Sequence, residues 1–206
     1  MWHFDSIAAW HDASKKGSGG TRIDVPPCVS VAGGGAHFVL ACEGPDKVYA
    51  LGDNRFGQLG NTDLGHEHVV PVALFSSAEC FEARIAQVAA GGRHSVALAD
   101  DGCAYVWGWD SVQECVLEPA PVLFDDEHVD IDVVEVACGA AHTLLCLSDG
   151  SVWGTGTGAS MLTDDHMELA GSGAAAADQP HPVVTGAGPV RRVLASGWSS
   201  FAEVGL

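Results

Sequence analysis

The segment Val31–His37 reads VAGGGAH, and the chain repeats it as VAAGGRH at Val88–His94 and VACGAAH at Val136–His142. A fourth version, VLASGWS at Val193–Ser199, ends in Trp-Ser where the others end in Ala-His or Arg-His. These openings lie roughly 50 residues apart, and repetition at such a period is typical of propellers, solenoids and related arrays. The repeated segment therefore decides the architecture before any single residue is interpreted.

A β-hairpin is predicted after each of the first three copies. The first hairpin has arms at His37–Cys42 and Val48–Leu51, joined by a turn at Glu43–Asp46. The next two turn at Asp100–Gly102 and Ser148–Gly150, and each contains Asp-Gly, a strong hairpin signal because both turn residues need positive φ. Their arms are Ser95–Ala99 with Ala104–Trp107 and Thr143–Leu147 with Val152–Trp153, and the three hairpins end at Gly52, Gly108 and Gly154.

A further strand beginning with Pro is expected before each later copy, at Pro71–Phe75, Pro121–Phe124 and Pro182–Thr185. A Pro is tolerated at the start of a strand. We assign each of these strands to the unit that it precedes, which gives units of four short antiparallel strands. Such units, repeating about every 40–50 residues, predict an all-β fold of β-propeller blades.

The predicted propeller is incomplete, because the fourth unit reaches only its second strand near Phe201–Val204. We place the repeat region at residues 25–206, with openings near 31, 88, 136 and 193, and a divergent or flexible segment at 1–24. That segment holds the best helix candidate, Phe4–Ala13, and a linker-like run at Gly17–Gly20. An incomplete ring leaves open blade edges, which favour self-association.

The chain is strongly acidic, with 27 acidic and 9 basic residues among 206 and a net charge of −18. This balance argues against direct nucleic-acid binding, which needs Lys and Arg to displace phosphate counterions. Most acidic residues lie in predicted turns, where they form either a solvated edge or an acidic loop face that attracts a basic protein. Both interpretations remain open from the sequence.

Membrane insertion and secretion are not expected. The chain has no run of 18 apolar residues and no basic start followed by an apolar core. Its seven Cys include no Cys-x-x-Cys pair, so we expect free thiols and a cytoplasmic or nuclear protein.

No residue pattern predicts catalysis, a metal or a cofactor. His37, His94 and His142 share one repeat position, so they should lie far apart around a ring and form hydrogen bonds within their own blades. The loops His66–His68 and Asp164–His166 lack a third or fourth ligand at fixed spacing. Neither a phosphate-binding loop nor a nucleophile elbow is present, so we predict a protein that is not an enzyme.

The segment Lys47–Gly60, KVYALGDNRFGQLG, ends in Gly-Gln-Leu-Gly. Together with the Val-Ala-x-Gly-x-x-His openings and the Asp-Gly turns, it resembles the regulator of chromosome condensation repeat from about Val31 onward. The second copy is most similar to small single-domain members of that family. Family propellers usually have seven blades, whereas this chain has about three and a half repeats. The ultraviolet-sensing members carry Gly-Trp-Arg-His-Thr, which this chain lacks, so photoreception is not implied.

The resemblance implies a non-enzymatic scaffold that presents acidic propeller loops to a protein partner. In similar small members that partner belongs to chromatin-modifying or to tRNA- and translation-factor-modifying machinery. The alternative that the family implies is guanine-nucleotide exchange on a Ran-like small GTPase, with that GTPase as the partner.

Partner contacts are expected where aromatic and charged residues meet at a loop. Trp109 follows a Trp-Gly strand end and precedes Asp110, and Trp is enriched at binding hot spots. Packing within a blade is the other interpretation of the Trp residues. Our candidate partner-binding residues are Trp109, Asp110, Asp53, Asn54, Arg55 and Trp198, and our structural repeat positions are His37, His94, His142, Gly52, Gly108 and Gly154.

Overall fold

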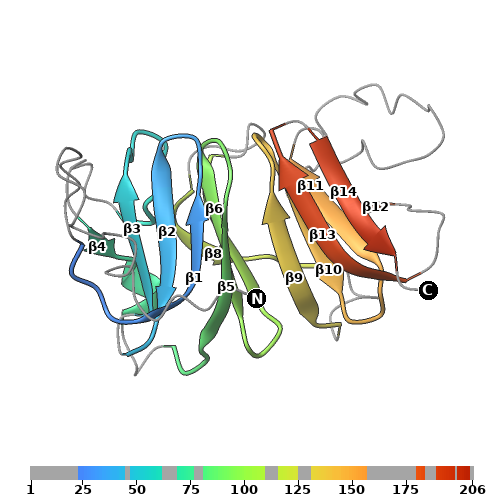
Figure 1. Ribbon diagram of the computed structural model, residues 1–206, viewed down its shortest axis with the longest axis horizontal. Coiled ribbons are helices and arrows are strands. Elements are labelled where there is room, and N and C mark those ends of the chain that lie inside the picture. The colour runs from blue at the N-terminus through green and yellow to red at the C-terminus, as the bar shows by residue number, and fades with distance from the viewer. Residues whose placement is uncertain are drawn as a thin grey trace, which may run out of the picture.

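Four antiparallel sheets lie side by side in the computed structural model of the chain (Figure 1). The structure describes residues 23–44, 47–61, 69–76, 81–109, 116–124, 131–156, 180–183, 189–197 and 199–204. The helix candidate Phe4–Ala13, the linker-like run Gly17–Gly20 and the loops His66–His68 and Asp164–His166 lie outside these residues.

The first three sheets are four-stranded blades, and the fourth sheet has two strands. Blade 1 contains β1 (Cys28–Gly33), β2 (His37–Cys42), β3 (Val48–Gly52) and β4 (Val70–Pro71). Blade 2 contains β5 (Ile85–Ala90), β6 (His94–Ala99), β7 (Ala104–Gly108) and β8 (Val116–Pro121). Blade 3 contains β9 (Val133–Cys138), β10 (His142–Leu147), β11 (Val152–Gly156) and β12 (His181–Val183), and sheet 4 contains β13 (Val190–Ser196) and β14 (Ser199–Val204).

The second strand of each complete blade is the most buried. β6 and β10 are buried along their whole length, and β2 is buried except at Phe38. Their nearly continuous apolar sequence fits a strand covered on both faces. The predicted hairpin arms are confirmed, except that the second arm of the third hairpin runs on to Gly156. The predicted turns at Asp100–Gly102 and Ser148–Gly150 are confirmed, whereas the first turn lies partly outside the described residues. The partial propeller is confirmed as an arc of blades.

The strands predicted to begin with Pro are placed differently. β8 ends at Pro121, β4 ends at Pro71, and residues Ala73–Phe75 form a 3-10 helix, η2. β4 pairs with β3 through Tyr49↔Pro71, so this strand closes the blade before it and does not open the next one. Pro fits there because β4 and β8 are the outer edge strands, where one side of the backbone needs no ladder partner.

Hydrophobic cores lie between the blades. Val39, Phe75 and Trp107 belong to the core between blades 1 and 2. Val96, Leu145 and Trp153 belong to the core between blades 2 and 3, and a smaller cluster joins blade 3 to sheet 4. Each blade thus covers the apolar face of its neighbour, as in other repeat proteins.

The three repeated His residues link neighbouring blades, which corrects the prediction that they bond within their own blade. Nε2 of His37 lies 2.9 Å from Ser95 Oγ, and Nε2 of His94 lies 3.0 Å from Thr143 Oγ1. His142 continues the series at 2.7 Å from Ser200 Oγ. The partner of each His is therefore a hydroxyl residue of the next sheet, and it follows that sheet's own repeated His or, for Ser200, the Ser199 that replaces it.

A second series of hydrogen bonds crosses the same interfaces. The residue before each repeated Val accepts a hydrogen bond from the backbone N–H of the next blade's repeated Val. Ser30 accepts from Val88 at 3.1 Å, Gln87 accepts from Val136 at 3.1 Å, and Glu135 accepts from Val193 at 2.7 Å. The position thus needs an acceptor, although its residue type varies.

Candidate protein-interaction site

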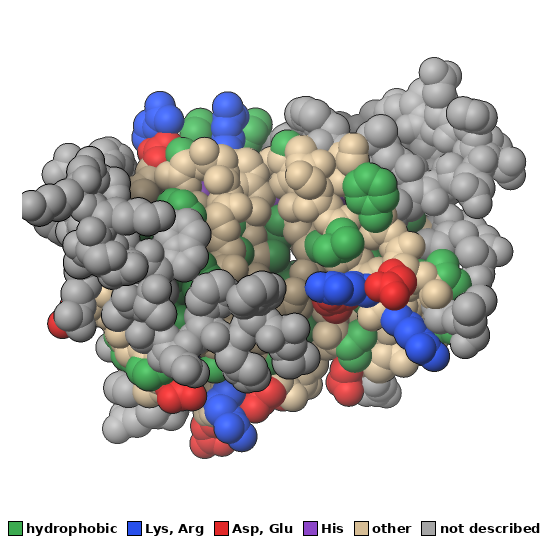
Figure 2. All heavy atoms as spheres, in the orientation of Figure 1, with side chains coloured by type: hydrophobic (Ala, Val, Ile, Leu, Met, Phe, Trp, Pro, Cys, Tyr) green, Lys and Arg blue, Asp and Glu red, His purple; other side chains and the backbone are tan. Residues whose placement is uncertain are grey.

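The two rims of the arc differ in charge. The loop rim is the edge at Gly33–His37, Gly52–Gly60, Gly91–His94 and Gly108–Trp109, and the turn rim is the opposite edge with the hairpin turns. Acidic side chains of the described residues gather on the turn rim, along the lower edge in Figure 2. They are Glu43, Glu82, Asp100, Asp101, Asp132 and Asp149, with Arg84 paired to Asp100. The loop rim carries Asp53, Arg55 and Arg93. Figure 2 shows basic side chains along its upper edge.

The loop after β3 is shaped by the Gly-Gln-Leu-Gly sequence. Gly57 and Gly60 adopt positive φ, and a Cβ on Gly60 would lie 2.9 Å from Trp107 Nε1. The backbone oxygen of Gln58 accepts hydrogen bonds from Trp107 Nε1 at 2.9 Å and from Ser95 Oγ at 2.8 Å. This loop of blade 1 is therefore fastened to blade 2.

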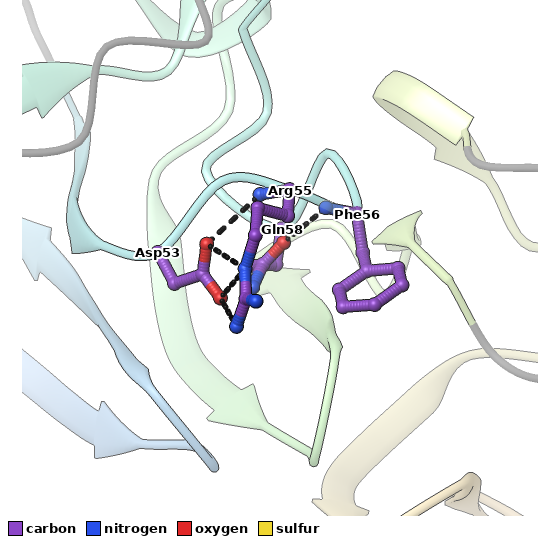
Figure 3. Close-up of polar contacts among 4 residues, drawn as sticks. All are labelled: Asp53, Arg55, Phe56 and Gln58. Carbon is purple, nitrogen blue, oxygen red and sulfur yellow. Dashed lines mark hydrogen bonds and ion pairs between the residues drawn. The ribbon is translucent and has the colours of Figure 1, made fainter.

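An ion pair lies at the exposed bend of this loop. Arg55 folds back onto Asp53, with Nη2 2.6 Å from Oδ2 and Nε 2.8 Å from the same oxygen. Figure 3 shows the Phe56 ring pointing away from this pair, while the Phe56 N–H donates to Gln58 Oε1 at 2.9 Å. The Arg55 side chain is 71% exposed and that of Asp53 is 16% exposed, so the pair presents mainly its guanidinium to solvent.

Beside this pair an arginine is held against two aromatic rings, and we call Phe56, Arg93 and Trp109 the Arg93 stack. The Arg93 guanidinium carbon lies 4.3 Å from the Phe56 ring centroid and 4.8 Å from that of Trp109. The two ring centroids are 5.8 Å apart, and the Trp109 N–H donates to the Arg93 backbone oxygen at 2.9 Å. The stack thus joins the loop of blade 1 to two strand ends of blade 2.

The Arg93 stack has the composition of a protein-binding site. Arg93 is exposed, and Phe56 and Trp109 are partly buried. Cation–π contacts hold a guanidinium over aromatic faces without using its N–H donors. Arg and Trp are also the residue types enriched at interface hot spots. A partner that binds here would bury apolar surface against the two rings and accept hydrogen bonds from the Arg93 guanidinium at the same site.

The predicted site residues divide into three groups. Trp109, Asp53 and Arg55 lie together on the loop rim, whereas Asp110 and Trp198 fall outside the described residues. Asn54 is fully buried: its Oδ1 accepts from the Leu59 N–H at 2.9 Å and its Nδ2 lies 3.1 Å from Asn61 Oδ1. Asn54 holds the loop in shape, so we correct its assignment as a contact residue.

Two members of the Arg93 stack were missed from the sequence. Arg93 replaces the Ala found at the same position of the first and third copies, Ala36 and Ala141. Phe56 lies directly before the Gly-Gln-Leu-Gly sequence. An exposed repeat position with a unique charged residue was the available signal for Arg93, but its pairing with Phe56 depends on how two blades pack.

One structural repeat position also needs correction. Gly52 and Gly108 end their strands with positive φ, opposite His37 and His94 in the ladder. The residue opposite His142 is Gly156, which also has positive φ, whereas Gly154 lies inside β11. The glycine at the end of the third hairpin was therefore predicted two residues too early. An offset of two residues keeps each side chain on the same face of the strand, so the apolar pattern does not reveal it.

Other classes of site find no support in the described part of the chain. There, no group of three or more His, Cys, Asp or Glu is placed to hold a metal ion. Among the same residues, no helix is long and apolar enough to cross a membrane.

Comparison with known proteins identifies the repeats. A model described as the regulator of chromosome condensation (RCC1) repeat matches residues 45–98, and a second model with the same description matches 85–113 and 133–160. The Ultraviolet-B receptor UVR8 of Arabidopsis thaliana is 34% identical over 159 residues, which cover 67% of this chain and 34% of the relative. The human Regulator of chromosome condensation is 31% identical over 145 residues, covering 66% of this chain and 32% of the relative.

Solved structures agree on the fold. Prp20p from Saccharomyces cerevisiae, reported with its binding properties to Gsp1p and histones, superposes with a TM-score of 0.66 at 21% identity. The match covers 84% of this chain and 41% of that chain, and the chain spans about a third of the two curated relatives. The chain belongs to the regulator of chromosome condensation (RCC1) repeat family.

Proposed function

We propose that this protein is a non-enzymatic scaffold that binds a protein partner on its loop rim. The observation that carries the proposal is the Arg93 stack, an exposed guanidinium held against two aromatic rings next to the Asp53–Arg55 ion pair. The acidic turn rim supplies long-range attraction to a basic partner, in addition to the contact site itself.

The family supports the partner class that we propose. Human RCC1 and Prp20p support chromatin or a small GTPase as the setting, since the Prp20p structure is reported with binding to Gsp1p and histones. Chromatin-modifying machinery and tRNA- or translation-factor-modifying machinery are the two settings that we propose for a nuclear or cytoplasmic scaffold of this kind. The net charge of −18 favours a partner that is basic overall, and the exposed Arg93 favours one that offers hydrogen-bond acceptors at the contact site.

The test is capture of the partner from a lysate, followed by binding measurements with the purified partner. We expect Trp109→Ala with Arg93→Ala to weaken the affinity at least about tenfold, mainly through faster dissociation. The matched control is Glu82→Gln with Asp101→Asn on the turn rim, which should slow association and reduce its salt dependence. Unchanged affinity in the stack variant at an unchanged melting temperature would refute the proposed site.

The second candidate function is guanine-nucleotide exchange on a Ran-like GTPase. The similarity to human RCC1 and to Prp20p favours it. A nucleotide-release assay with a fluorescent GDP-loaded Ran-like GTPase separates the two functions. Accelerated release would establish exchange, and no acceleration at micromolar concentrations of both proteins would leave the scaffold function.

A further inference from the structure

Two blade faces at the ends of the arc expose positions that are buried or partly buried at the internal interfaces. Val31 and Phe38 face away from blade 2 and are 51% and 52% exposed. The same positions in blade 2, Val88 and Ser95, are buried against blade 1. At the other end Leu194 and Phe201 pair across β13 and β14 and are 52% and 61% exposed. Figure 2 shows hydrophobic side chains gathered over these strands.

The internal interfaces show what these positions do. The pair equivalent to Leu194 and Phe201 is Ala89 and Val96 in blade 2, which pack into the core against blade 3. In blade 3 it is Ala137 and Leu144, which pack into the core against sheet 4. The exposed face of sheet 4 therefore corresponds to the face of blades 1, 2 and 3 that packs against the next sheet in the chain. The exposed face of blade 1 corresponds to the face of blades 2 and 3 and of sheet 4 that packs against the preceding blade.

At the two open faces, the large and small residues are the reverse of those at the internal interfaces. At every internal interface a large His meets a small hydroxyl residue, Ser95, Thr143 or Ser200. At the open ends the His position holds Ser199, and the hydroxyl position holds Phe38. A small residue on sheet 4 thus matches a large one on blade 1, so the summed volume is kept while the buried hydrogen bond becomes an apolar contact. Volume-conserving exchanges of this kind are the ones that packed interfaces tolerate.

We propose that a second copy of this chain docks head to tail on these faces, sheet 4 of each copy on blade 1 of the other, closing a two-copy ring. The match covers 41% of the single Prp20p chain, so two copies together correspond to roughly four-fifths of it. A head-to-tail contact must close or else form an open filament. The proposal concerns blade faces and does not depend on the proposed partner site on the loop rim.

Substitution of Arg192 provides a second test of the proposed docking. It occupies the position at which Ser30, Gln87 and Glu135 accept the N–H of the next repeated Val. A guanidinium has no acceptor, and Arg192 instead pairs with Glu135, Nε to Oε1 at 3.6 Å. In the proposed ring Arg192→Gln restores an acceptor opposite the Val31 N–H, so we expect this variant to associate more tightly, by about tenfold.

The experiment is the solution mass of the full chain by light scattering and sedimentation, over about 1 to 100 μM, a range matched to ordinary protein–protein affinities. We expect twice the 21.3 kDa of one chain. Phe38→Asp and Phe201→Asp should each give monomers, because each removes one face of both contacts. Leu123→Asp, at a 65% exposed residue away from both faces, is the control and should stay dimeric.

Mixing the two monomeric variants decides the geometry. A head-to-tail ring predicts that Phe38→Asp and Phe201→Asp chains associate one to one, because one of the two contacts is then wild type. Circular dichroism of each variant confirms that it is folded. A wild-type monomer at every concentration, a dimer that survives either substitution, or a mass that grows without limit would each overturn the two-copy ring.

Discussion

His37 shows how one buried side chain reports on the contact between two blades. Ser95 donates its hydroxyl proton to the Gln58 backbone oxygen, so it must accept a hydrogen bond from His37 Nε2. Nδ1 is then the unprotonated nitrogen, and in the described residues it is buried without a hydrogen-bond partner. Burial lowers the pKa of His37 to about 4 and also lowers the pKa of His142. Both rings are therefore neutral in the folded protein at neutral pH.

The lowered pKa predicts acid sensitivity. The folded protein holds fewer protons than the unfolded chain once the pH falls below about 6.5, so the free energy of unfolding should decrease from there to about pH 4. For His37 alone the loss is on the order of 3 kcal/mol at pH 4. Urea titrations at several pH values measure it, and His37→Gln should flatten the dependence. A pH-independent stability between pH 6.5 and 4 would contradict the neutral, buried His.

The glycine three residues before each repeated His makes room for the ring. A Cβ on Gly91 would lie 2.1 Å from His94 Cε1 and 2.7 Å from the Gly139 backbone oxygen. We expect Gly91→Ala to lower the free energy of unfolding by about 2–3 kcal/mol, since neither the ring nor the next blade can move freely. Chemical denaturation measures the loss. Ala36→Ser, at an exposed position of the same repeated segment, should change stability by less than about 0.5 kcal/mol.

Strands β1 and β2 place two thiols side by side. Cys28 and Cys42 are register partners, and their Sγ atoms lie 2.7 Å apart. The hydrogen bond from Cys42 lowers the pKa of Cys28, which favours its thiolate. Thiolate attack on glutathione disulfide, followed by displacement of glutathione by Cys42, would form a protein disulfide and release two molecules of glutathione.

We therefore expect glutathione disulfide to cross-link Cys28 and Cys42, with a mass loss of two hydrogens that peptide mapping assigns. Closing this loop should raise the free energy of unfolding by about 2–3 kcal/mol. Cys28→Ser should abolish both changes, whereas Cys103→Ser, at an exposed thiol, should abolish neither. Cross-linking of another pair in the wild-type chain would show that the strand register does not direct the reaction.

The distribution of charge over the whole arc predicts a salt effect on stability. The net charge is −18, and the described turn rim brings Asp100, Asp101 and Asp132 to neighbouring turns. Salt screens repulsion between exposed charges. The melting temperature should rise by a few degrees between about 20 and 200 mM NaCl. Asp101→Asn with Asp132→Asn should reduce this rise, and an equal rise in that variant would place the repulsion elsewhere.

Much of the fold follows from local sequence. Asp-Gly turns, alternating apolar residues and the repeated Val-Ala-Gly segment define the hairpins, because turn conformation and strand alternation depend on adjacent residues. The edge strands were assigned to the wrong blade, since pairing of β4 with β3 rather than β5 is a choice between distant segments. The offset at Gly154 has a different origin: it lies within one hairpin, where a two-residue shift keeps every side chain on its face and so leaves the apolar pattern unchanged.

The candidate site was only partly visible in the sequence. Trp109 and Arg55 could be chosen as aromatic and charged residues beside strand ends. Their neighbours could not, because Phe56 and Arg93 meet only when the loop of blade 1 is fastened to blade 2 through Gln58. The exclusion of Asn54 likewise needed its side-chain partners.

The sequence by itself determined the blades, their order and the acidic character of the chain, because these depend on short-range patterns and composition. The tertiary structure decided which side chain of one blade meets which of the next: His37 with Ser95, Phe56 with Arg93, and the absence of an equivalent contact at Phe38 and Phe201 in the described chain. Contacts between blades join residues far apart in the chain, and no local propensity encodes them.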